Sequence, residues 1–372
     1  MRRAGHSPTM PRPSVRTLGV EEELLLVDPR TGHLTAVADF AVPANERAEE
    51  VEKELFLQMI ETSTEPCLTA ADLEVGIRAG RRAVGEAAAA AGARAVATAT
   101  PVLAGNEADF TPSARYRRIQ AEYGELARQA LVCAMHVHVG VGDDEEAVRV
   151  VDRIRPWLPL LVAISSNSPY WHGRDTGHAS WRSQVWSRWP TAGPAQPFGD
   201  VATYRSVAER MLAYGGGLDP GMLYFDVRLA QHFPTVEIRV ADVTTDVEDV
   251  VLVAMLARAL VATVAQDAGA PTWRGDLLRV ASWRAARTGL AGDLVHPVEG
   301  TPVPAREVFD ATVAFACDAL AEAGDLELVQ DSFERLVARG TGATRQRSTQ
   351  ERTGDLAAVV EDLARRTEES WM

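Results

Sequence analysis

The stretch Thr17–Asp28, TLGVEEELLLVD, alternates as a β-strand does and carries three consecutive glutamates. Because strand side chains point alternately to the two faces of a sheet, Glu21 and Glu23 share one face and Glu22 lies on the other. Two carboxylates 4 Å apart repel each other by about 1 kcal/mol in water, and by several times as much in a drier cleft. A cation that offsets this repulsion is therefore expected beside Glu21 and Glu23.

Chemically active side chains recur at alternate positions of further β-rich segments. The segments MHVHVGV, FDVRL, TVEIRVADV and KELFLQMIETSTEP supply, in that order, His136 and His138, Asp226 and Arg228, Glu237 and Arg239, and Glu54, Glu61 and Glu65. For any one strand, a plain solvated face of an antiparallel sheet is the better interpretation. Together, carboxylates, imidazoles and guanidiniums form the mixture that binds hard cations and anionic substrates. Because carboxylates outnumber histidines, Mg²⁺ or Mn²⁺ is favoured over zinc.

Arginine supplies nearly all of the positive charge, since the chain has a single lysine, Lys53. A P-loop and Schiff-base catalysis both need a lysine, so a bound anion must be held by arginine, backbone amides or metal. Arg239 is suited to bidentate binding of a phosphate or carboxylate, whereas Arg174 and Arg182 fit such a role and a surface ion pair equally well. Four nearby tryptophans suit a lid over a nucleotide base or, more often, ordinary packing: Trp171, Trp181, Trp186 and Trp189.

Composition restricts the partners. The net charge of −14 and the pI near 5.1 argue against a nucleic acid or an anionic membrane and favour small molecules or metals. Arg258 interrupts the longest apolar run, so no membrane span is expected, and the three scattered cysteines fit a reducing cytoplasm. Residues 1–15 lack the apolar core of a signal peptide and are expected to form a disordered leader, followed by a single domain over 16–372.

The hydrophobic pattern predicts strands that are followed by many helices. Strands are predicted at 17–27, 55–64, 94–100, 132–141, 221–229 and 235–242. Helices are predicted from the N-cap Thr69 to Gly92 and at 113–130, 144–165, 201–213, 246–268, 304–322 and 347–368, with a functional loop at 166–200. Only AQHFP joins the last two strands, which predicts a hairpin. The predicted fold class is α+β, a largely antiparallel sheet with helices packed on it.

Taken in order, these blocks resemble the type-two glutamate-cysteine ligase family, in particular its carboxylate-amine ligase branch. The matching blocks are GVEEEL, ELFLQMIETSTEPC, MHVHVGV, SPYWHGRDTGHASWRSQVW and TVEIRVADV, with SWRAARTGLAGDLVHP as a weaker match, and the resemblance covers about residues 15–365. It implies the fold of glutamine synthetase and the guanidino kinases, in which an antiparallel sheet forms a funnel around the active site. It also implies ATP-dependent amide formation, in which an amine, by default that of cysteine, attacks an acyl phosphate made from a carboxylate, by default the γ-carboxylate of glutamate.

The resemblance further implies ATP and Mg²⁺ or Mn²⁺ as cofactors, small-molecule substrates and a homodimer. The implied metal ligands are Glu21, Glu23, Glu61 and Glu237, followed by Glu54 and His136. The implied catalytic side chains are Arg239, Arg182 and Arg174, and the implied nucleotide-binding side chains are Arg239, Arg228 and His138.

Three other functions remain open at this point. A guanidino-type phosphotransferase would make a stable phosphorylated product and no amide. A metal-dependent hydrolase would use the same carboxylates and histidines without ATP. A non-catalytic module would bind Mg-ATP and turn nothing over, although a site without catalysis has no need to tolerate the repulsion within its acidic set.

Overall fold

The computed structural model describes residues 15–44, 51–105, 108–266 and 271–372. The predicted leader, 1–15, therefore lies almost wholly outside the described residues. Within the described ranges, no helix is both long enough and apolar enough to cross a membrane.

A seven-stranded antiparallel sheet forms the centre of the molecule. Six of its strands follow the order β2-β3-β1-β5-β9-β8, and the seventh, β4, pairs with β1. β5 pairs with the first half of β1, and β4 pairs with the end of β1 on the same side. The strands are β1 (Leu18–Val27), β2 (Val51–Lys53), β3 (Met59–Ser63), β4 (Arg94–Val96), β5 (Ala134–Gly140), β8 (Val227–Leu229) and β9 (Thr235–Asp242). The predicted antiparallel sheet is confirmed, as is the hairpin of its last two strands.

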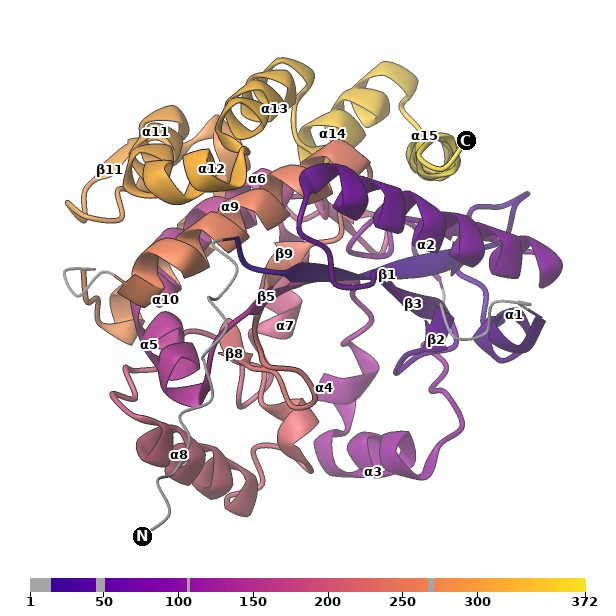
Figure 1. Cartoon of the computed structure of the whole chain (residues 1–372). Helices are drawn as coiled ribbons and strands as arrows, with labels where there is room; N and C mark the ends of the chain where they lie inside the picture. Colours follow the sequence, from indigo (N-terminus) through magenta and orange to yellow (C-terminus); the bar gives the residue numbers. More distant parts are fainter. Residues whose placement is uncertain (1–14, 45–50, 106–107, 267–270) are drawn as a thin grey trace, which may run out of the picture.

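Helices cover one face of this sheet and bury its apolar side chains. The helices in contact with the strands there are α2 (Ala70–Ala90), α5 (Asp144–Ile154), α6 (Leu158–Ser165) and α9 (Val247–Gln266). Figure 1 shows α2 and α9 along one side of β1, with α3 (Ala114–Tyr123) and α4 (Glu125–Arg128) on the opposite side. The sheet thus has one face that these four helices pack against and a second face that they leave uncovered.

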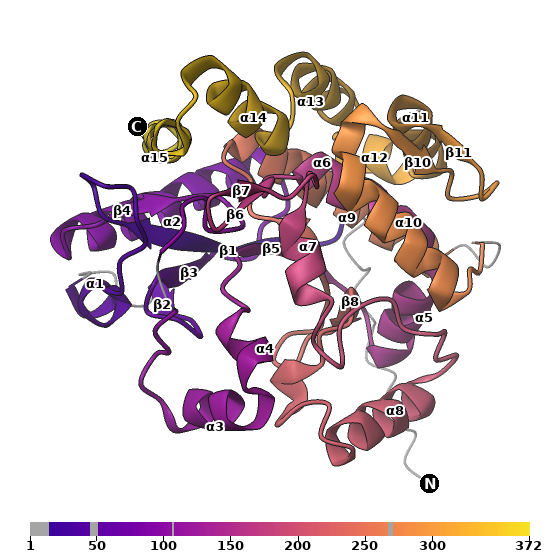
Figure 2. The same cartoon turned by 180° about the vertical axis from the view of Figure 1, so that it is seen from behind.

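Residues 305–369 form an outer helical layer, which Figure 2 shows passing over α2 and α9. Its helices are α11 (Ala305–Phe315), α12 (Cys317–Ala323), α13 (Leu326–Arg339), α14 (Gly342–Thr353) and α15 (Leu356–Glu369). The remaining helices are α1 (Ala38–Ala44), α7 (Trp181–Trp186), α8 (Val201–Ala213) and α10 (Gly275–Thr288). Two small hairpins pair β6 (Tyr170–Trp171) with β7 (Arg174–Asp175) and β10 (Asp293–Val295) with β11 (Pro302–Pro304).

Several predicted helices are confirmed, and others are shorter than the pattern suggested. Thr69 caps α2 by accepting a hydrogen bond from the Asp72 N–H at 3.1 Å, and α8 has its predicted bounds. The long helices predicted at 113–130, 144–165, 304–322 and 347–368 are each divided, at Gly124, at the 3₁₀ turn Arg155–Trp157, at Ala316 and at Gly354. Gly124 and Gly354 adopt φ of +53° and +70°, which an α-helix cannot continue through.

Some elements lack the signal on which sequence patterns depend. Helices α10 and α13 are additional to the predicted set, and neither has a side-chain hydrogen bond at its N-cap, Arg274 or Asp325. The predicted loop 166–200 contains β6, β7 and α7.

Three predicted strands are too long. The strand predicted at 221–229 is wrong in its first part, because Pro220–Met222 form a 3₁₀ turn and only Val227–Leu229 join the sheet. Pairing also ends at Val96 in the segment 94–100 and begins only at Met59 in the segment 55–64.

Candidate active site

A cavity of about 270 Å³ lies on the face of the sheet opposite α2 and α9. All six implied metal ligands line it, as do three of the implied anion-binding side chains: Glu21, Glu23, Glu54, Glu61, His136 and Glu237, with Arg228, Arg239 and His138. The structure therefore brings these residues from five separate segments into one site.

Strand register explains why these side chains meet. On β1, Glu21 pairs with His136 of β5, and Glu23 pairs with Glu61 of β3. On β9, Glu237 pairs with His138 on one side and with Arg228 on the other. Directly opposed residues point to the same face with Cβ atoms about 5 Å apart, so the alternation of each strand becomes a continuous polar row across the sheet.

Glu21 lies between two imidazoles. His136 Nδ1 lies 3.2 Å from Glu21 Oε2, and His138 Nε2 lies 3.2 Å from Glu21 Oε1. Burial alone would raise the pKa of Glu21, but the hydrogen bonds from the two histidines outweigh it and hold that pKa well below its ordinary value.

His136 itself is a neutral imidazole at physiological pH. Burial, and then the nearby Arg239 guanidinium, lowers the pKa of His136 to about 4. In the tautomer that donates from Nδ1 to Glu21, Nε2 carries a lone pair, and this buried atom has no hydrogen-bond partner among the described residues. An unpaired imidazole nitrogen of this kind is a ready metal ligand.

Three carboxylates form the opposite end of the site. Glu23, Glu54 and Glu61 each place an oxygen within 4.8 Å of the others. Burial, followed by the Glu54 charge, raises the pKa of Glu23 to about 8 and raises that of Glu61 well above its ordinary value. The Ala134 N–H donates to Glu23 at 2.6 Å and fixes its direction. Without a counter-ion, Glu23 therefore keeps its proton at neutral pH.

Glu237 is surrounded by arginine. Arg228 donates to its two oxygens from Nε at 2.7 Å and from Nη2 at 3.1 Å, and Arg239 Nη1 donates to Glu237 Oε1. Burial alone would raise the pKa of Glu237, but Arg239 and Arg228 hold it well below its ordinary value. The site is therefore polarised, with a carboxylate cluster at one end and two guanidiniums at the other.

Aromatic side chains form one wall, which sequence reasoning largely missed. The Arg239 guanidinium lies 5.7 Å from the Tyr224 ring centre, and the Tyr224 and Trp186 rings are 4.6 Å apart. Trp186 belongs to the aromatic segment 166–200, but no sequence pattern marked Tyr224 or Tyr116. Both tyrosines line the cavity, Tyr116 from α3. Burial raises the pKa of Tyr224 to about 12, so it remains a neutral phenol.

Two of the expected arginines do not line the cavity. Arg182 is buried behind the wall, where its Nη2 donates to the Arg239 carbonyl at 2.9 Å. Arg174 lies exposed on β7, and the structure does not bring it to the site. Of the tryptophans, Trp189 packs in the core against Tyr123.

The donor set fits a hard divalent cation. Three overlapping groups place their ligand atoms within 4.8 Å of one another: Glu21, His138 and Glu237; Glu21, Glu61 and His136; and Glu23, Glu54 and Glu61. Their oxygens suit Mg²⁺ or Mn²⁺, and a cation would relieve the repulsion that raises the pKa of Glu23 and Glu61. The residues present therefore fit the implied metal.

Comparison with known proteins identifies close relatives. A family model described as "Glutamate-cysteine ligase family 2" matches residues 17–362. A protein of Nocardioides sp. named "Putative glutamate--cysteine ligase 2-1" is 50% identical, with 96% of this chain and 97% of that protein covered. A "Putative glutamate--cysteine ligase 2" of Streptomyces coelicolor is 46% identical, with 95% of this chain and 99% of that protein covered.

Solved structures share the fold at low sequence identity. A glutamate–cysteine ligase of Francisella tularensis, solved in complex with AMP, superposes with a TM-score of 0.65 at 14% identity, covering 96% of this chain and 89% of that one. A bifunctional glutathione synthetase of Pasteurella multocida gives a TM-score of 0.67 at 14% identity and covers 96% of this chain, which spans about half (53%) of that protein. These likenesses confirm the predicted fold class.

Proposed function

This chain belongs to glutamate-cysteine ligase family 2, and we propose on that premise that it is an ATP-dependent ligase that joins a carboxylate to an amine. We further propose the γ-carboxylate of glutamate and the amine of cysteine as its substrates, with γ-glutamylcysteine, ADP and phosphate as products. The ligase function is supported most directly by the polarised cavity, in which a carboxylate cluster and two arginines share one face of the sheet.

Phosphoryl transfer between two bound anions needs charge neutralisation and alignment rather than a protein nucleophile. Bound Mg²⁺ or Mn²⁺ supplies positive charge to the phosphate oxygens when it is held by the carboxylates and imidazoles of the three groups above. Arg239 and Arg228 add positive charge at the other end of the cavity, and their planar guanidiniums suit phosphate or carboxylate oxygens.

The reaction has two steps. A substrate carboxylate oxygen attacks the γ-phosphorus of ATP, the bond to the leaving ADP breaks, and an acyl phosphate forms. The amine then attacks the acyl carbon, the bond to phosphate breaks, and the amine loses a proton as the amide forms. Trp186, Tyr224 and Phe56 give one wall of the cavity apolar surface, which limits the access of water that would otherwise hydrolyse the acyl phosphate.

Trapping the intermediate separates this function from the alternatives. With Mg-ATP, glutamate and hydroxylamine, the enzyme should form γ-glutamyl hydroxamate in step with ADP, because hydroxylamine attacks the acyl carbon. A guanidino-type phosphotransferase, a hydrolase and a silent nucleotide binder all produce no hydroxamate. If ATP binds and no hydroxamate forms with glutamate or with a panel of other carboxylic acids, the ligase proposal is wrong and only the fold assignment stands.

A further inference from the structure

Asp242, the last residue of β9, is a buried carboxylate that lies outside the cavity. It is 1% exposed, and both of its oxygens accept hydrogen bonds. Oδ2 accepts from the Asn167 N–H at 2.9 Å and from Ser168 Oγ at 2.7 Å, and Oδ1 accepts from Ser180 Oγ at 2.7 Å. All three donors belong to the segment that enters α7.

The two serine hydroxyls connect Asp242 to the first turn of α7. Ser180 is the N-cap of this helix, and its Oγ accepts from the Ser183 N–H at 3.4 Å. Ser168 Oγ accepts from the Arg182 N–H at 3.1 Å. A hydroxyl donates one hydrogen bond and accepts two, so each serine serves Asp242 and α7 together. Asp242 therefore orients both hydroxyls toward the helix.

Helix α7 in turn supports the cavity wall. Arg182 Nη2 donates to the Arg239 carbonyl at 2.9 Å, and the Arg182 guanidinium lies 5.8 Å from the Trp186 ring centre. Trp186 packs on Tyr224, over which the Arg239 guanidinium lies. Asp242 is thus connected to Arg239 through α7: hydrogen bonds join Asp242 to the start of the helix, and Arg182 and Trp186 of the helix contact the backbone of Arg239 and the Tyr224 ring beside its side chain.

We propose that Asp242 is a positioning residue for the active site, which locks α7 against β9 so that Arg182 and Trp186 hold Arg239 in its working orientation. The role in turnover rests on the proposed function, whereas the locking of α7 does not. A misplacement of about 1 Å in such a wall is enough to slow turnover about 100-fold.

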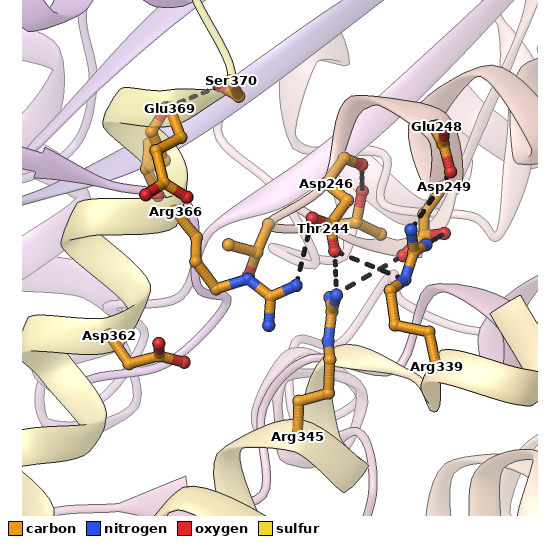
Figure 3. A network of polar contacts seen from close by, with 12 residues as sticks. Thr244, Asp246, Glu248, Asp249, Arg339, Arg345, Asp362, Arg366, Glu369 and Ser370 are labelled. Carbon is orange, nitrogen blue, oxygen red and sulfur yellow. Dashed lines mark hydrogen bonds and ion pairs between the residues drawn. The ribbon is translucent and has the colours of Figure 1, made fainter. Parts of the chain in front are cut away.

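Asp249 of α9 provides a matched control. It is a second buried aspartate, 2% exposed, and it takes part in the ion-pair network that joins the C-terminal helices to the turn after β9 (Figure 3). Arg339 Nη2 donates to Asp249, while Arg345 and Arg366 pair with Asp246. Asp249 is not among the residues that line the cavity, so its replacement is a control for the loss of a buried carboxylate elsewhere in the fold.

The test compares Asp242→Asn with Asp249→Asn by hydrogen–deuterium exchange and by steady-state kinetics. An amide has one accepting oxygen, so an asparagine side chain at this position cannot accept from donors on both sides. In Asp242→Asn, the amides of Arg182 and Ser183 should exchange at least tenfold faster, and kcat should fall about 100-fold with KM changed less than threefold. Asp249→Asn should leave both readouts within twofold of wild type. Unchanged exchange in α7, or equal losses of kcat in the two variants, would overturn the proposal.

Ser168→Ala and Ser180→Ala keep the proposal testable if Asp242→Asn does not fold. Each removes one connection, and each should raise exchange at its own α7 amide, that of Arg182 or Ser183. Where all variants fold, Asp242→Asn combined with Ser180→Ala should lose little more kcat than Asp242→Asn alone, because both act through one contact. Fully additive losses would count against the connection. Hydrogen–deuterium exchange needs no substrate. If the wild-type protein forms no hydroxamate, the proposed function is wrong, whereas exchange at the α7 amides still decides whether Asp242 locks this helix.

Discussion

Glu22 and Arg81 form a buried, bidentate ion pair directly behind the cavity. Arg81 Nε and Nη2 donate to Glu22 Oε2 and Oε1 at 2.9 and 2.6 Å, between β1 and α2. Glu23 is the next residue of the strand but points to the other face, where it meets the carboxylates of Glu54 and Glu61. Adjacent glutamates of one strand therefore have opposite environments, one paired and one crowded by like charge.

Glu22→Gln should destabilise the fold strongly. It removes one partner of a fully buried pair and leaves the Arg81 charge without compensation, although Arg81 also donates to the Thr244 and Thr245 carbonyls. Loss of one partner of a buried ion pair costs about 3–5 kcal/mol. Denaturant unfolding monitored by circular dichroism measures this loss, and a change below about 1 kcal/mol would show that the pair contributes little.

Glu23→Gln should have the reverse effect on stability while abolishing ADP formation. The amide cannot ionise, whereas Glu23 gains a buried charge beside Glu54 as the pH approaches 8, so at pH 8 the metal-free variant should melt at or above the wild-type temperature. It also removes a metal-ligating oxygen, so turnover should be lost. Full activity in this variant would contradict the role of Glu23 as a metal ligand. Glu22→Gln is the control for the stability measurement, because the same substitution at the adjacent residue should destabilise the fold.

Titration of Glu23 should lower the stability of the metal-free protein between about pH 4.5 and pH 8, while the lowered pKa of His136 acts in the opposite direction below about pH 6.5. Burial raises the pKa of Glu23 to about 8, and that of Glu61 also lies above its ordinary value. A carboxyl with a raised folded-state pKa stabilises the fold at low pH, and this contribution is lost as the pH rises through the folded-state pKa. Thermal melts across this range should show a steeper decline for wild type than for Glu23→Gln, and added Mg²⁺ should restore the melting temperature at pH 8. Parallel curves for the two proteins would show that Glu23 does not titrate in this window.

Arg239→Lys should lower kcat/KM about tenfold or more while the protein remains folded. Lysine keeps the positive charge but loses the planar contact over Tyr224 and the geometry that binds two oxygens of an anion. Steady-state kinetics with Mg-ATP as the varied substrate measures the effect. Equal activity of the lysine variant would mean that Arg239 supplies charge alone.

Much of the site can be predicted from the sequence because strand alternation is local. The two-residue period of Thr17–Asp28 places Glu21 and Glu23 on one face whatever the strand packs against. The same rule places Glu237 and Arg239 on one face of their strand. Because Lys53 is the single lysine, the sequence predicts that arginine, backbone amides or metal would hold a bound anion. The antiparallel hairpin of β8 and β9 follows from its short connection.

Only the tertiary structure decided which of these residues meet. Glu21 opposes His136 and Glu23 opposes Glu61 because the apolar cores under the sheet set the register of β1, β3 and β5, which are far apart in the chain. Arg174 and Arg182 are indistinguishable by sequence, yet one is exposed and the other is buried against β9. The sequence by itself determines the face of each strand, because that depends on local backbone geometry. The partners across the sheet depend on long-range packing, which also brings Tyr116, Trp186 and Tyr224 together from three separate segments to form the aromatic wall.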